Sequence, residues 1–351
     1  MDIKELDYEE LEQYLLSIGE KQFRTKQLFL WIHARRIRQF SDAHNIGQRL
    51  TGILKEKFKL QMPELVERFV SIDGTEKYLM RLGDGELIES VLMRYRGDFS
   101  KQRNTLCVSS QVGCAMGCAF CATGHQGFTR SLTVSEILGQ IYLANDILGQ
   151  HESGQEIRNI VFMGMGEPFN NFDAVLKSCR ILCHPMGMNL SPRRITISTC
   201  GVVPRIREFA DLDTDLELAI SLHATNNSDR DVLMPVNQRY PLTELIDSCV
   251  YYQEKTGKRI SFEYALIKDV NDTEKQVREL THLLHPLDCH VNVIPVNSVN
   301  HGSFTKPNKR DVEAFIDALR KNGVGASVRQ EKGADIDGAC GQLKTRYTKS
   351  S

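Results

Sequence analysis

The feature that most constrains the fold of this chain is an alternation of strand-like and helix-like segments from residue 104 almost to the end. Short apolar runs rich in β-branched residues predict strands over residues 105–110, 159–163, 194–199, 216–222, 260–266 and 290–295. Helical periodicity, often after a Ser, Thr or Asp that can cap a helix, marks residues 133–148, 173–184, 204–210, 242–255, 274–284 and 309–322. Repeated strand–helix units predict an α/β fold with a parallel sheet or barrel.

A different pattern precedes this alternation. Residues 8–18 and 25–38 have helical periodicity, whereas residues 65–95 read as short strands around turns at Asp73-Gly74 and Gly83-Asp84-Gly85. We therefore expect three parts along the chain. They are an N-terminal helical accessory domain over residues 1–60, a short-strand linker region over residues 61–103 and the main domain over residues 104–351.

Composition adds few restrictions. The chain has 44 Lys and Arg residues against 45 Asp and Glu residues, so its net charge does not indicate a polyanionic partner. No stretch approaches the roughly 20 consecutive apolar residues of a membrane span, and residues 1–10 do not resemble a secretory signal. We expect a cytoplasmic protein without membrane association, whose 10 cysteines act as ligands or reagents because a reducing compartment disfavours disulfides.

A compact cysteine motif follows the first predicted strand. Cys114, Cys118 and Cys121 can bind three irons of a [4Fe-4S] cluster and leave the fourth iron without a protein ligand. Such an open iron can chelate S-adenosylmethionine (SAM) and cleave it reductively to a 5′-deoxyadenosyl radical. A structural zinc site is the alternative, but such sites use four protein ligands, usually in CxxC pairs, and no second pair is obvious in the sequence.

Other polar or glycine residues fall at or just beyond the ends of predicted strands, where parallel α/β folds place their chemistry. They are Gly166, Glu167, Thr199, His223 and Asn297. Each of them alone is more often a tight turn or a satisfied polar residue near a strand end. Their shared position predicts that they converge with the cysteine motif from separate loops.

The best candidate for contact with nucleic acid is the segment of residues 21–40. It contains no acidic residue, and its basic and aromatic residues are Lys21, Arg24, Lys26, Arg35, Arg36 and Arg38 with Phe23, Phe29, Trp31 and Phe40. An amphipathic helix with aromatic residues in the core and a solvated basic face explains the same pattern equally well. The segment by itself does not decide between the two.

The cysteine motif with its strand–helix units resembles the radical SAM superfamily, and further motifs resemble one group within it. The sequences at residues 109–114, 164–168 and 190–194 and the loop around Cys340 are similar to the RlmN/Cfr family of RNA adenosine methyltransferases, over residues 20 to 343. The resemblance implies a partial (β/α)6 barrel, a [4Fe-4S] cluster and two SAM molecules per turnover. It implies that SAM contacts Gly166, Glu167, Ser198, Ser221, Leu222, His223 and Asn297, and it favours RNA binding by the basic segment.

The same resemblance assigns roles to residues outside the cluster motif. Cys340 would take a methyl group from one SAM molecule and become S-methylcysteine, which the radical from a second molecule then joins to adenine. Cys107 would resolve this link by attacking the Cys340 sulfur in a transient disulfide, and Glu89 would accept the ring proton. Glu89 can also be read as a strand-edge carboxylate. The remaining cysteines, Cys179, Cys183, Cys200, Cys249 and Cys289, are interpreted as core thiols.

Within this family, RlmN-type members methylate carbon 2 of adenosine in 23S rRNA and in some tRNAs, and Cfr-type members methylate carbon 8. Pro168 and the segments 262–266 and 291–295 resemble the RlmN branch, whereas Pro192 resembles the Cfr branch. We expect carbon 2, with 23S rRNA, tRNA and an electron donor such as flavodoxin or ferredoxin as partners of a monomer. The alternatives are carbon 8 methylation, which confers antibiotic resistance, and a non-catalytic iron–sulfur protein that binds RNA.

Overall fold

The computed structural model describes residues 1–97, 100–151, 155–297 and 304–344. Its centre is a 10-stranded sheet with the order β1-β2-β3-β4-β7-β8-β9-β10-β11-β12, accompanied by a separate pair of strands, β5 and β6. The strands of the large sheet are β1 (Glu64–Val70), β2 (Glu76–Arg81), β3 (Leu87–Gly97), β4 (Ser100–Cys107), β7 (Asn159–Phe162), β8 (Ile195–Thr199), β9 (Glu217–Ser221), β10 (Ile260–Leu266), β11 (Cys289–Pro295) and β12 (Gly325–Val328).

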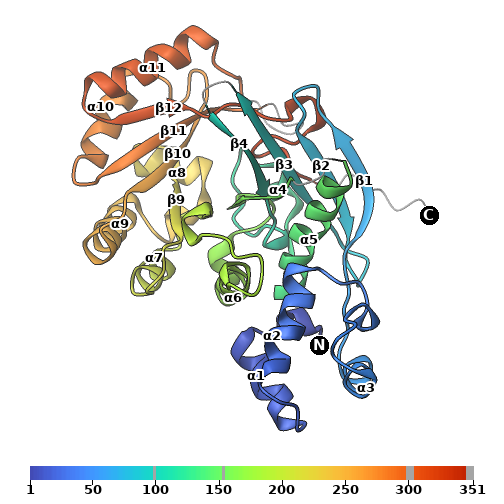
Figure 1. Ribbon diagram of the computed structural model, residues 1–351. Helices are drawn as coiled ribbons and strands as arrows, with labels where there is room; N and C mark the ends of the chain where they lie inside the picture. Colours follow the sequence, from blue (N-terminus) through green and yellow to red (C-terminus); the bar gives the residue numbers. More distant parts are fainter. Residues whose placement is uncertain (98–99, 152–154, 298–303, 345–351) are drawn as a thin grey trace.

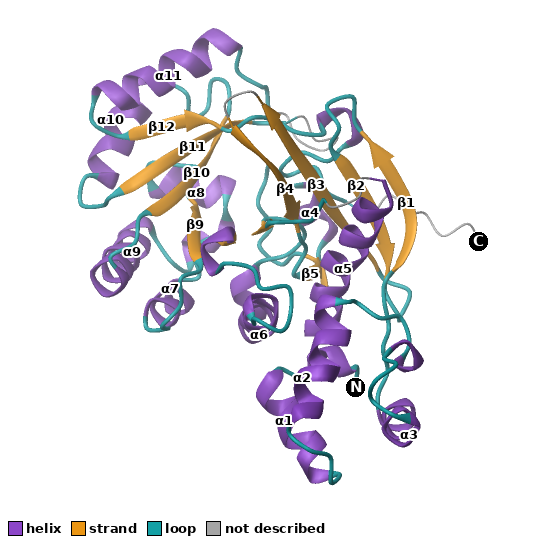
Figure 2. Ribbon diagram, viewed as in Figure 1, coloured by secondary structure: helices purple, strands orange, loops and turns teal. Residues whose placement is uncertain are grey.

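The neighbouring strands from β4 to β12 are parallel, and helices connect them. These helices lie on the outer side of the curved sheet (Figures 1 and 2). They are α5 (Val134–His151), α6 (Phe172–Cys183), α7 (Val203–Ala210), α9 (Leu242–Thr256), α10 (Glu274–Leu284) and α11 (Lys309–Lys321). The predicted α/β fold with a partial barrel is confirmed, and the strand ends that carry polar residues meet at one edge of the sheet.

Two details differ from the sequence-based prediction. The first predicted strand extends to residue 110, but β4 ends at Cys107, because the backbone N–H of Ser109 donates to the side chain of Gln140 at 2.9 Å rather than to a neighbouring strand. The prediction also missed β12 at the end of the sheet. This strand has four residues and little apolar pattern, so its pairing with β11 rather than its composition makes it a strand.

The antiparallel strands β1, β2 and β3 continue the same sheet beyond β4. The predicted short strands between residues 65 and 95 are therefore confirmed, and hydrogen bonds join them directly to the barrel. In this pairing Val91 of β3 lies opposite Cys107 of β4. The extension thus brings a stretch of chain that precedes the barrel next to the end of its first strand.

The N-terminal region contains α1 (Tyr8–Ser17), α2 (Phe23–Phe29) and α3 (Gln48–Lys57), and it packs beside α5 (Figure 1). A π-helical turn, Leu30–Ala34, extends α2. The predicted helix over residues 25–38 is too long, because the backbone of Arg36 has a positive φ of 53° that a right-handed helix does not accept. Among the described residues, no helix is long and apolar enough to cross a membrane.

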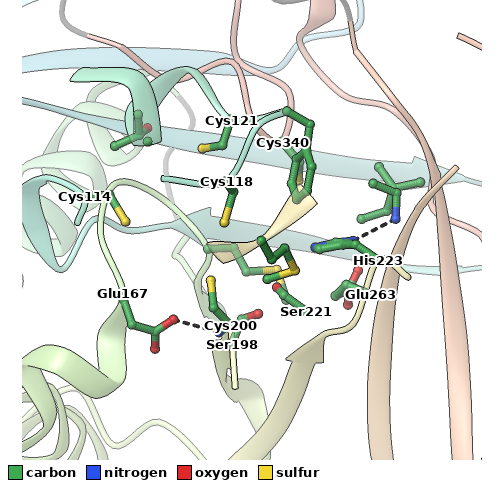
Figure 3. Close-up of a pocket in the computed structure, with 18 of the residues that line it drawn as sticks. Cys114, Cys118, Cys121, Glu167, Ser198, Cys200, Ser221, His223, Glu263 and Cys340 are labelled. Carbon is green, nitrogen blue, oxygen red and sulfur yellow. Dashed lines mark hydrogen bonds between the residues drawn. The ribbon is translucent and has the colours of Figure 1, made fainter. Parts of the chain in front are cut away.

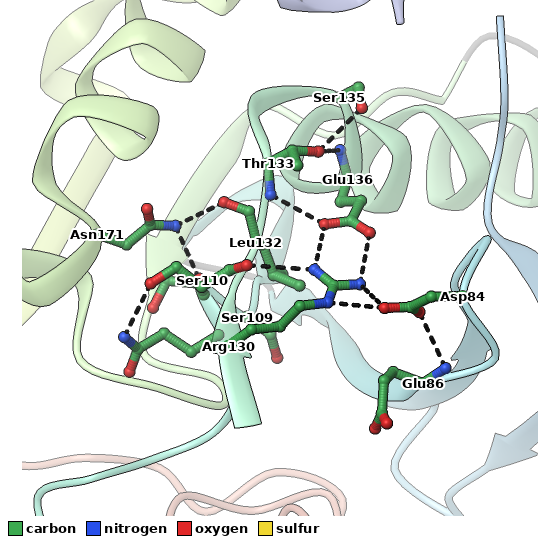
Figure 4. Close-up of polar contacts among 12 residues, drawn as sticks. Asp84, Glu86, Ser109, Ser110, Arg130, Leu132, Thr133, Ser135, Glu136 and Asn171 are labelled. Atoms are coloured by element: carbon green, nitrogen blue, oxygen red, sulfur yellow. Dashed lines mark hydrogen bonds and ion pairs between the residues drawn. The ribbon is translucent and has the colours of Figure 1, made fainter. Parts of the chain in front are cut away.

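A polar network fastens β6 (Phe128–Ser131) to its surroundings (Figure 4). The Arg130 guanidinium donates to both carboxylate oxygens of Glu136 on α5 at 2.8 Å and pairs with Asp84 in the turn between β2 and β3. The Asn171 side chain donates to the carbonyls of Ser110 and Leu132 at 2.9 and 2.8 Å. Three distant parts of the chain are thereby tied to the strand that follows the cysteine motif.

Candidate active site

Two adjoining cavities lie at the carboxyl ends of the parallel strands. The first has a volume of about 150 Å³, and among its lining residues are Cys114, Cys118, Cys121, Gly166, Glu167, Ser198, Ser221, His223, Asn297 and Cys340. The second is smaller, about 40 Å³, and among its lining residues are Val91, Met93, Cys107, Asn297, Arg329 and Cys340. The structure therefore gathers nearly all the predicted site residues around two connected spaces.

The cysteine motif occupies the loop between β5 (Gln111–Gly113) and β6, and the end of this loop is closed tightly. The backbone N–H of Cys114 donates to the carbonyl of Gly127 at 2.8 Å. Gly113 has a φ of 72°, and a Cβ atom there would lie 1.9 Å from the same carbonyl oxygen, so only glycine fits. In Figure 3 the sulfurs of Cys114, Cys118 and Cys121 face a common space.

The arrangement of these thiols fits an iron–sulfur cluster better than zinc. Burial raises the pKa of Cys114 to about 12 and also raises that of Cys121, so a metal is needed to stabilise their thiolates. Within the described part of the chain, no three His, Cys, Asp or Glu side chains converge closely enough to hold one metal ion. Three thiols from one loop match a cubane with one open iron, in which each cysteine binds a different iron, whereas a structural zinc site uses four protein ligands on one ion.

Gly166 and Glu167 follow β7 and approach the cysteine loop from the other side. Gly166 has a φ of 100°, and a Cβ atom there would lie 2.5 Å from that of Gln111. The Glu167 carboxylate is buried and accepts the backbone N–H groups of Phe169 at 2.9 Å and Cys200 at 2.7 Å. Burial raises its pKa despite these hydrogen bonds. A ligand cation beside it would therefore be stabilised.

His223 follows β9 and points into the first cavity (Figure 3). Its Nδ1 accepts the backbone N–H of Ala265 at 2.8 Å, and burial lowers its pKa to about 3. The imidazole is therefore neutral with its proton on Nε2, which leaves one donor for a ligand. Ser221 also lines this cavity, whereas Leu222 is fully buried outside its lining.

Asn297 stands between the two cavities and has one free acceptor. Its Nδ2 donates to the carbonyl of Cys340 at 3.2 Å, while its buried Oδ1 has no hydrogen-bond partner. An unpaired buried acceptor is costly unless a ligand or water satisfies it. Ser198, near the end of β8, lines the first cavity as well. Both residues fit the binding of a polar cofactor.

Cys340 lines both cavities and lies in a loop docked onto the cysteine motif. The backbone N–H of Ala122 donates to the carbonyl of Gly341 at 2.7 Å, and the Thr123 hydroxyl donates to the carbonyl of Leu343 at 2.6 Å. The thiol of Cys340 is free and exposed. One side of it therefore faces the predicted cofactor site, and the other faces the cavity of Cys107.

Cys107 is buried at the end of β4, and its thiol is free. Burial raises its pKa to about 12, and the neighbouring Arg329 guanidinium partly offsets this rise. Arg329 donates to Glu263 at 3.0 Å, and Asn292 donates to the other oxygen of that carboxylate at 2.9 Å. The sequence analysis gave no role to Arg329 or Glu263, because Arg329 directly follows the unpredicted strand β12 and Glu263 was noted only as part of the segment 262–266.

Glu89 lies outside the lining of both cavities. It stands on β3 two residues from Val91, on the same strand face and about 7 Å along the strand. Its carboxylate pairs with Lys77 at 3.3 Å and accepts the backbone N–H of Lys344 at 2.9 Å, beneath the C-terminal loop. Burial raises its pKa to about 7, although Lys77 opposes the rise. A carboxyl with this pKa can exchange protons near neutral pH.

The side chains of the basic segment, residues 21–40, are divided between the core and the surface. Phe29 and Phe40 belong to the core, whereas the side chain of Phe23 is half exposed. Ion pairs neutralise part of the positive charge of this segment: Arg36 and Arg38 pair with Asp146, and Arg24 pairs with Glu20. Exposed on the surface are Lys21, Lys26 and Arg35, the last lying 4.0 Å over the ring of Trp31.

The cysteines interpreted as core thiols divide into two groups. Cys179, Cys249 and Cys289 are buried, and Cys183 packs against the core. Cys200 differs, because it follows β8 directly and its side chain lines the first cavity near Cys118. Its place just beyond a strand end was the signal that could have identified it in the sequence.

Comparisons with known proteins agree with this geometry. The sequence model of the radical SAM superfamily matches residues 108–281, and that of the ribosomal RNA large subunit methyltransferase N-terminal domain matches residues 1–60. A probable dual-specificity RNA methyltransferase RlmN from Clostridium perfringens (strain 13) is 45% identical over 350 residues, which cover 99% of this chain and 98% of that protein. A protein of the same description from Lachnospira eligens is 44% identical over 347 residues, which cover 99% of this chain and 96% of that protein.

A solved structure extends the comparison to three dimensions. The crystal structure of a radical SAM methyltransferase from Sphaerobacter thermophilus superposes with a TM-score of 0.92 at 42% identity, over 98% of this chain and 99% of that one. The match therefore extends over nearly the whole of both chains. The chain therefore belongs to the RlmN family of radical SAM RNA methyltransferases.

Proposed function

We propose that this protein methylates carbon 2 of an adenosine in 23S rRNA, and also in tRNA, through an S-methylcysteine at Cys340. The observation that carries the proposal is the position of Cys340, which lines one cavity with the cluster cysteines and the other with Cys107. Carbon 2 is supported by relatives near 45% identity that are described as RlmN. Two SAM molecules are consumed in each turnover, one for the methyl group and one for the radical.

The first cavity holds the cofactors in this proposal. Cys114, Cys118 and Cys121 hold the [4Fe-4S] cluster, and SAM contacts Gly166, Glu167, Ser198, Ser221, Leu222, His223 and Asn297. When bound, the cluster supplies the electron that cleaves SAM to a 5′-deoxyadenosyl radical. The buried Glu167 carboxylate binds the amino group of SAM and gains the cation that it lacks within the protein. The Nε2–H group of His223 and the free Oδ1 of Asn297 supply a donor and an acceptor.

Cys340 acts first as a nucleophile. Its thiolate would attack the methyl carbon of one SAM molecule, so that a sulfur–carbon bond forms on Cys340, the methyl–sulfonium bond breaks and S-adenosylhomocysteine leaves. The exposure of this thiol and its place on the cavity wall allow the attack. The hydrogen bond from Asn297 to the carbonyl of Cys340 holds the loop in place during transfer.

Cys107 and Glu89 release the product once the S-methylene radical of Cys340 has added to adenine and the adduct has given up its unpaired electron, for which the oxidised cluster would be the acceptor. Glu89 accepts the proton from carbon 2, for which its pKa of about 7 is suitable, and the C-terminal loop moves off its carboxylate to allow contact. The Cys107 thiolate then attacks the Cys340 sulfur, and the sulfur–carbon bond breaks with its electron pair moving to carbon. That carbon takes a proton and becomes the methyl group. Cys107 and Cys340 are left as a disulfide, which a thiol reductant must reopen.

The remaining partners follow from the N-terminal region and from the radical chemistry. Residues 1–60 form the accessory domain that contacts RNA, with the exposed Lys21, Lys26 and Arg35 beside Phe23 as contact points. Residues 61–103 link it to the main domain over residues 104–351. A flavodoxin or ferredoxin delivers the electron, and the protein acts as a monomer.

Mass spectrometry of digested rRNA and tRNA tests the proposal. RNA from cells with and without this chain is compared for 2-methyladenosine, 8-methyladenosine or neither. We expect 2-methyladenosine only where the chain is present; 8-methyladenosine would assign the Cfr-type reaction instead. Anaerobic protein incubated with reductant and SAM should also release 5′-deoxyadenosine, and an intact cluster that releases none would indicate a non-catalytic iron–sulfur protein.

A further inference from the structure

Cys200 is a fourth thiol at the predicted cluster site, and the reaction described above gives it no role. Its side chain lines the first cavity together with that of Cys118, and it packs against the small apolar cluster to which Cys118 belongs. Figure 3 shows the side chains of Cys200 and Cys118 directed toward one another, whereas Cys114 and Cys121 lie on other sides of the same space. The contact therefore involves one particular ligand of the cluster.

The backbone of Cys200 is fixed from both sides. Its N–H donates to Oε2 of Glu167 at 2.7 Å, and its carbonyl accepts from Nη2 of Arg230 at 2.7 Å. Arg230 is completely buried on α8 (Asn227–Leu233), and its guanidinium also donates to the carbonyl of Leu222 at 3.1 Å. Since both peptide groups are anchored on different elements, only rotation of the side chain remains free. The fold thus holds the backbone of Cys200 in place beside the first cavity, and Figure 3 shows the side chain in the rotamer that faces Cys118.

A thiol in this position affects the electron affinity of a bound cluster. Hydrogen bonds to the sulfurs of an iron–sulfur cluster withdraw negative charge and raise its reduction potential, because the reduced cluster carries one more negative charge than the oxidised one. Direct ligation by Cys200 is a different outcome. As a ligand, the Cys200 thiolate would bind the fourth iron of the cluster, and in this type of enzyme that iron is left free to bind SAM.

We propose that Cys200 is a positioning residue that donates a hydrogen bond from its thiol to the Cys118 sulfur and thereby raises the reduction potential of the cluster. The inference rests on the cluster assignment made under the proposed function. It adds a residue that sets how readily the cluster accepts an electron, while the contacts to SAM and RNA stay as described.

The experiment compares the full-length wild type with Cys200→Ala, Cys200→Val, Cys200→Ser and Cys179→Ala, all reconstituted anaerobically. Iron and sulfide content is measured first, and the midpoint potential is then taken from a redox titration followed by electron paramagnetic resonance. The substitutions by Ala and Val remove the hydrogen-bond donor at position 200, whereas the substitution by Ser replaces the thiol donor with a hydroxyl donor. Cys179 is a buried thiol on α6, outside the lining of the first cavity, and controls for the loss of a thiol elsewhere.

We expect Cys200→Ala and Cys200→Val to lower the ratio of reduced to oxidised cluster about tenfold at a fixed potential, which is about 59 mV for one electron. Cys200→Ser and Cys179→Ala should titrate close to the wild type. Full iron content with an unchanged midpoint in both apolar variants would overturn the inference. Loss of iron in both would also overturn it, because Cys200 would then be a structural or ligating residue. A wild type that takes up no iron and sulfide would instead contradict the proposed function.

Discussion

The two cavities share Met163, Ile294, Asn297, Arg329 and Cys340 but are assembled differently. Most of the first is built from short motifs at consecutive strand ends, such as the cysteine loop and the turn at Gly166. The second combines β3, the end of β4, the end of β11 and the C-terminal loop, which come from distant parts of the sequence. The comparison teaches that local sequence encodes most of the first cavity, whereas the second depends on long-range packing.

Their electrostatics differ as well. In the first cavity, burial raises the pKa of the Glu167 carboxyl and of the Cys114 thiol, and both need positive charge from a ligand or metal. In the second, the protein supplies the positive charge itself. Arg329, held by Glu263, lies beside Cys107 and favours its thiolate. The first cavity is thus suited to ligands and the second to chemistry between the protein's own thiols.

The largest expected effect comes from Cys118→Ala, which disables the first cavity alone. The variant should lose the visible absorbance of the cluster, release no 5′-deoxyadenosine and form neither product nor adduct, while its circular dichroism shows a folded barrel. Cys179→Ala, which removes a buried thiol from α6, should keep the absorbance. An unchanged spectrum in the Cys118 variant would refute ligation by this residue.

Cys107→Ala should disable the second cavity while leaving the first intact. Methyl transfer to Cys340 and attachment to RNA still proceed, so protein covalently bound to RNA should accumulate and be visible on a denaturing gel. Cys289→Ala, another buried thiol, is the control and should give free methylated RNA. Recovery of free, fully methylated RNA from the Cys107 variant would remove that residue from the reaction.

Glu89→Gln tests the carboxylate on the same strand face as the second cavity. Turnover should fall by about 10²-fold, as is usual for the loss of a general base. The wild-type rate should rise with pH up to about 7, because the carboxyl must be ionised to accept a proton and burial has raised its pKa to about 7. This acid limb should vanish in the variant and persist in Glu67→Gln, which alters an exposed carboxylate on β1. If Glu89→Gln kept the acid limb of the pH profile, the limb would arise from the titration of another group.

The smallest expected effect is that of Arg329→Gln on product release. Loss of a neighbouring cation raises the pKa of the Cys107 thiol further, and a shift of about one unit would make release about tenfold slower at a given pH. Because release requires the thiolate, raising the pH should restore the rate. Release is measured from preformed protein–RNA adduct, with Arg205→Gln, an exposed partner of Glu208, as the control. Equal rates at every pH would show that Arg329 does not influence Cys107.

The strand–helix alternation was sufficient to predict the α/β fold, because its periodicity records which residues face the core. The strand β12 escaped prediction since its pairing with β11, rather than its four residues, makes it a strand. Helix α2 was predicted too long because only the observed backbone places Arg36 at positive φ. The aromatic residues of the basic segment could not be divided into core and surface without the packing against α5.

The sequence by itself determined the residues whose chemistry depends on local spacing, namely the cysteine motif and the glycine turn before Glu167. The family resemblance added Cys107, Cys340 and Glu89, but without their environment. Only the tertiary structure decided that Cys340 adjoins two cavities, that Arg329 lies beside Cys107 and that Cys200 meets Cys118. The physical reason is that electrostatic and hydrogen-bond effects depend on distance in space, which spacing along the chain encodes only within a loop or a helical turn.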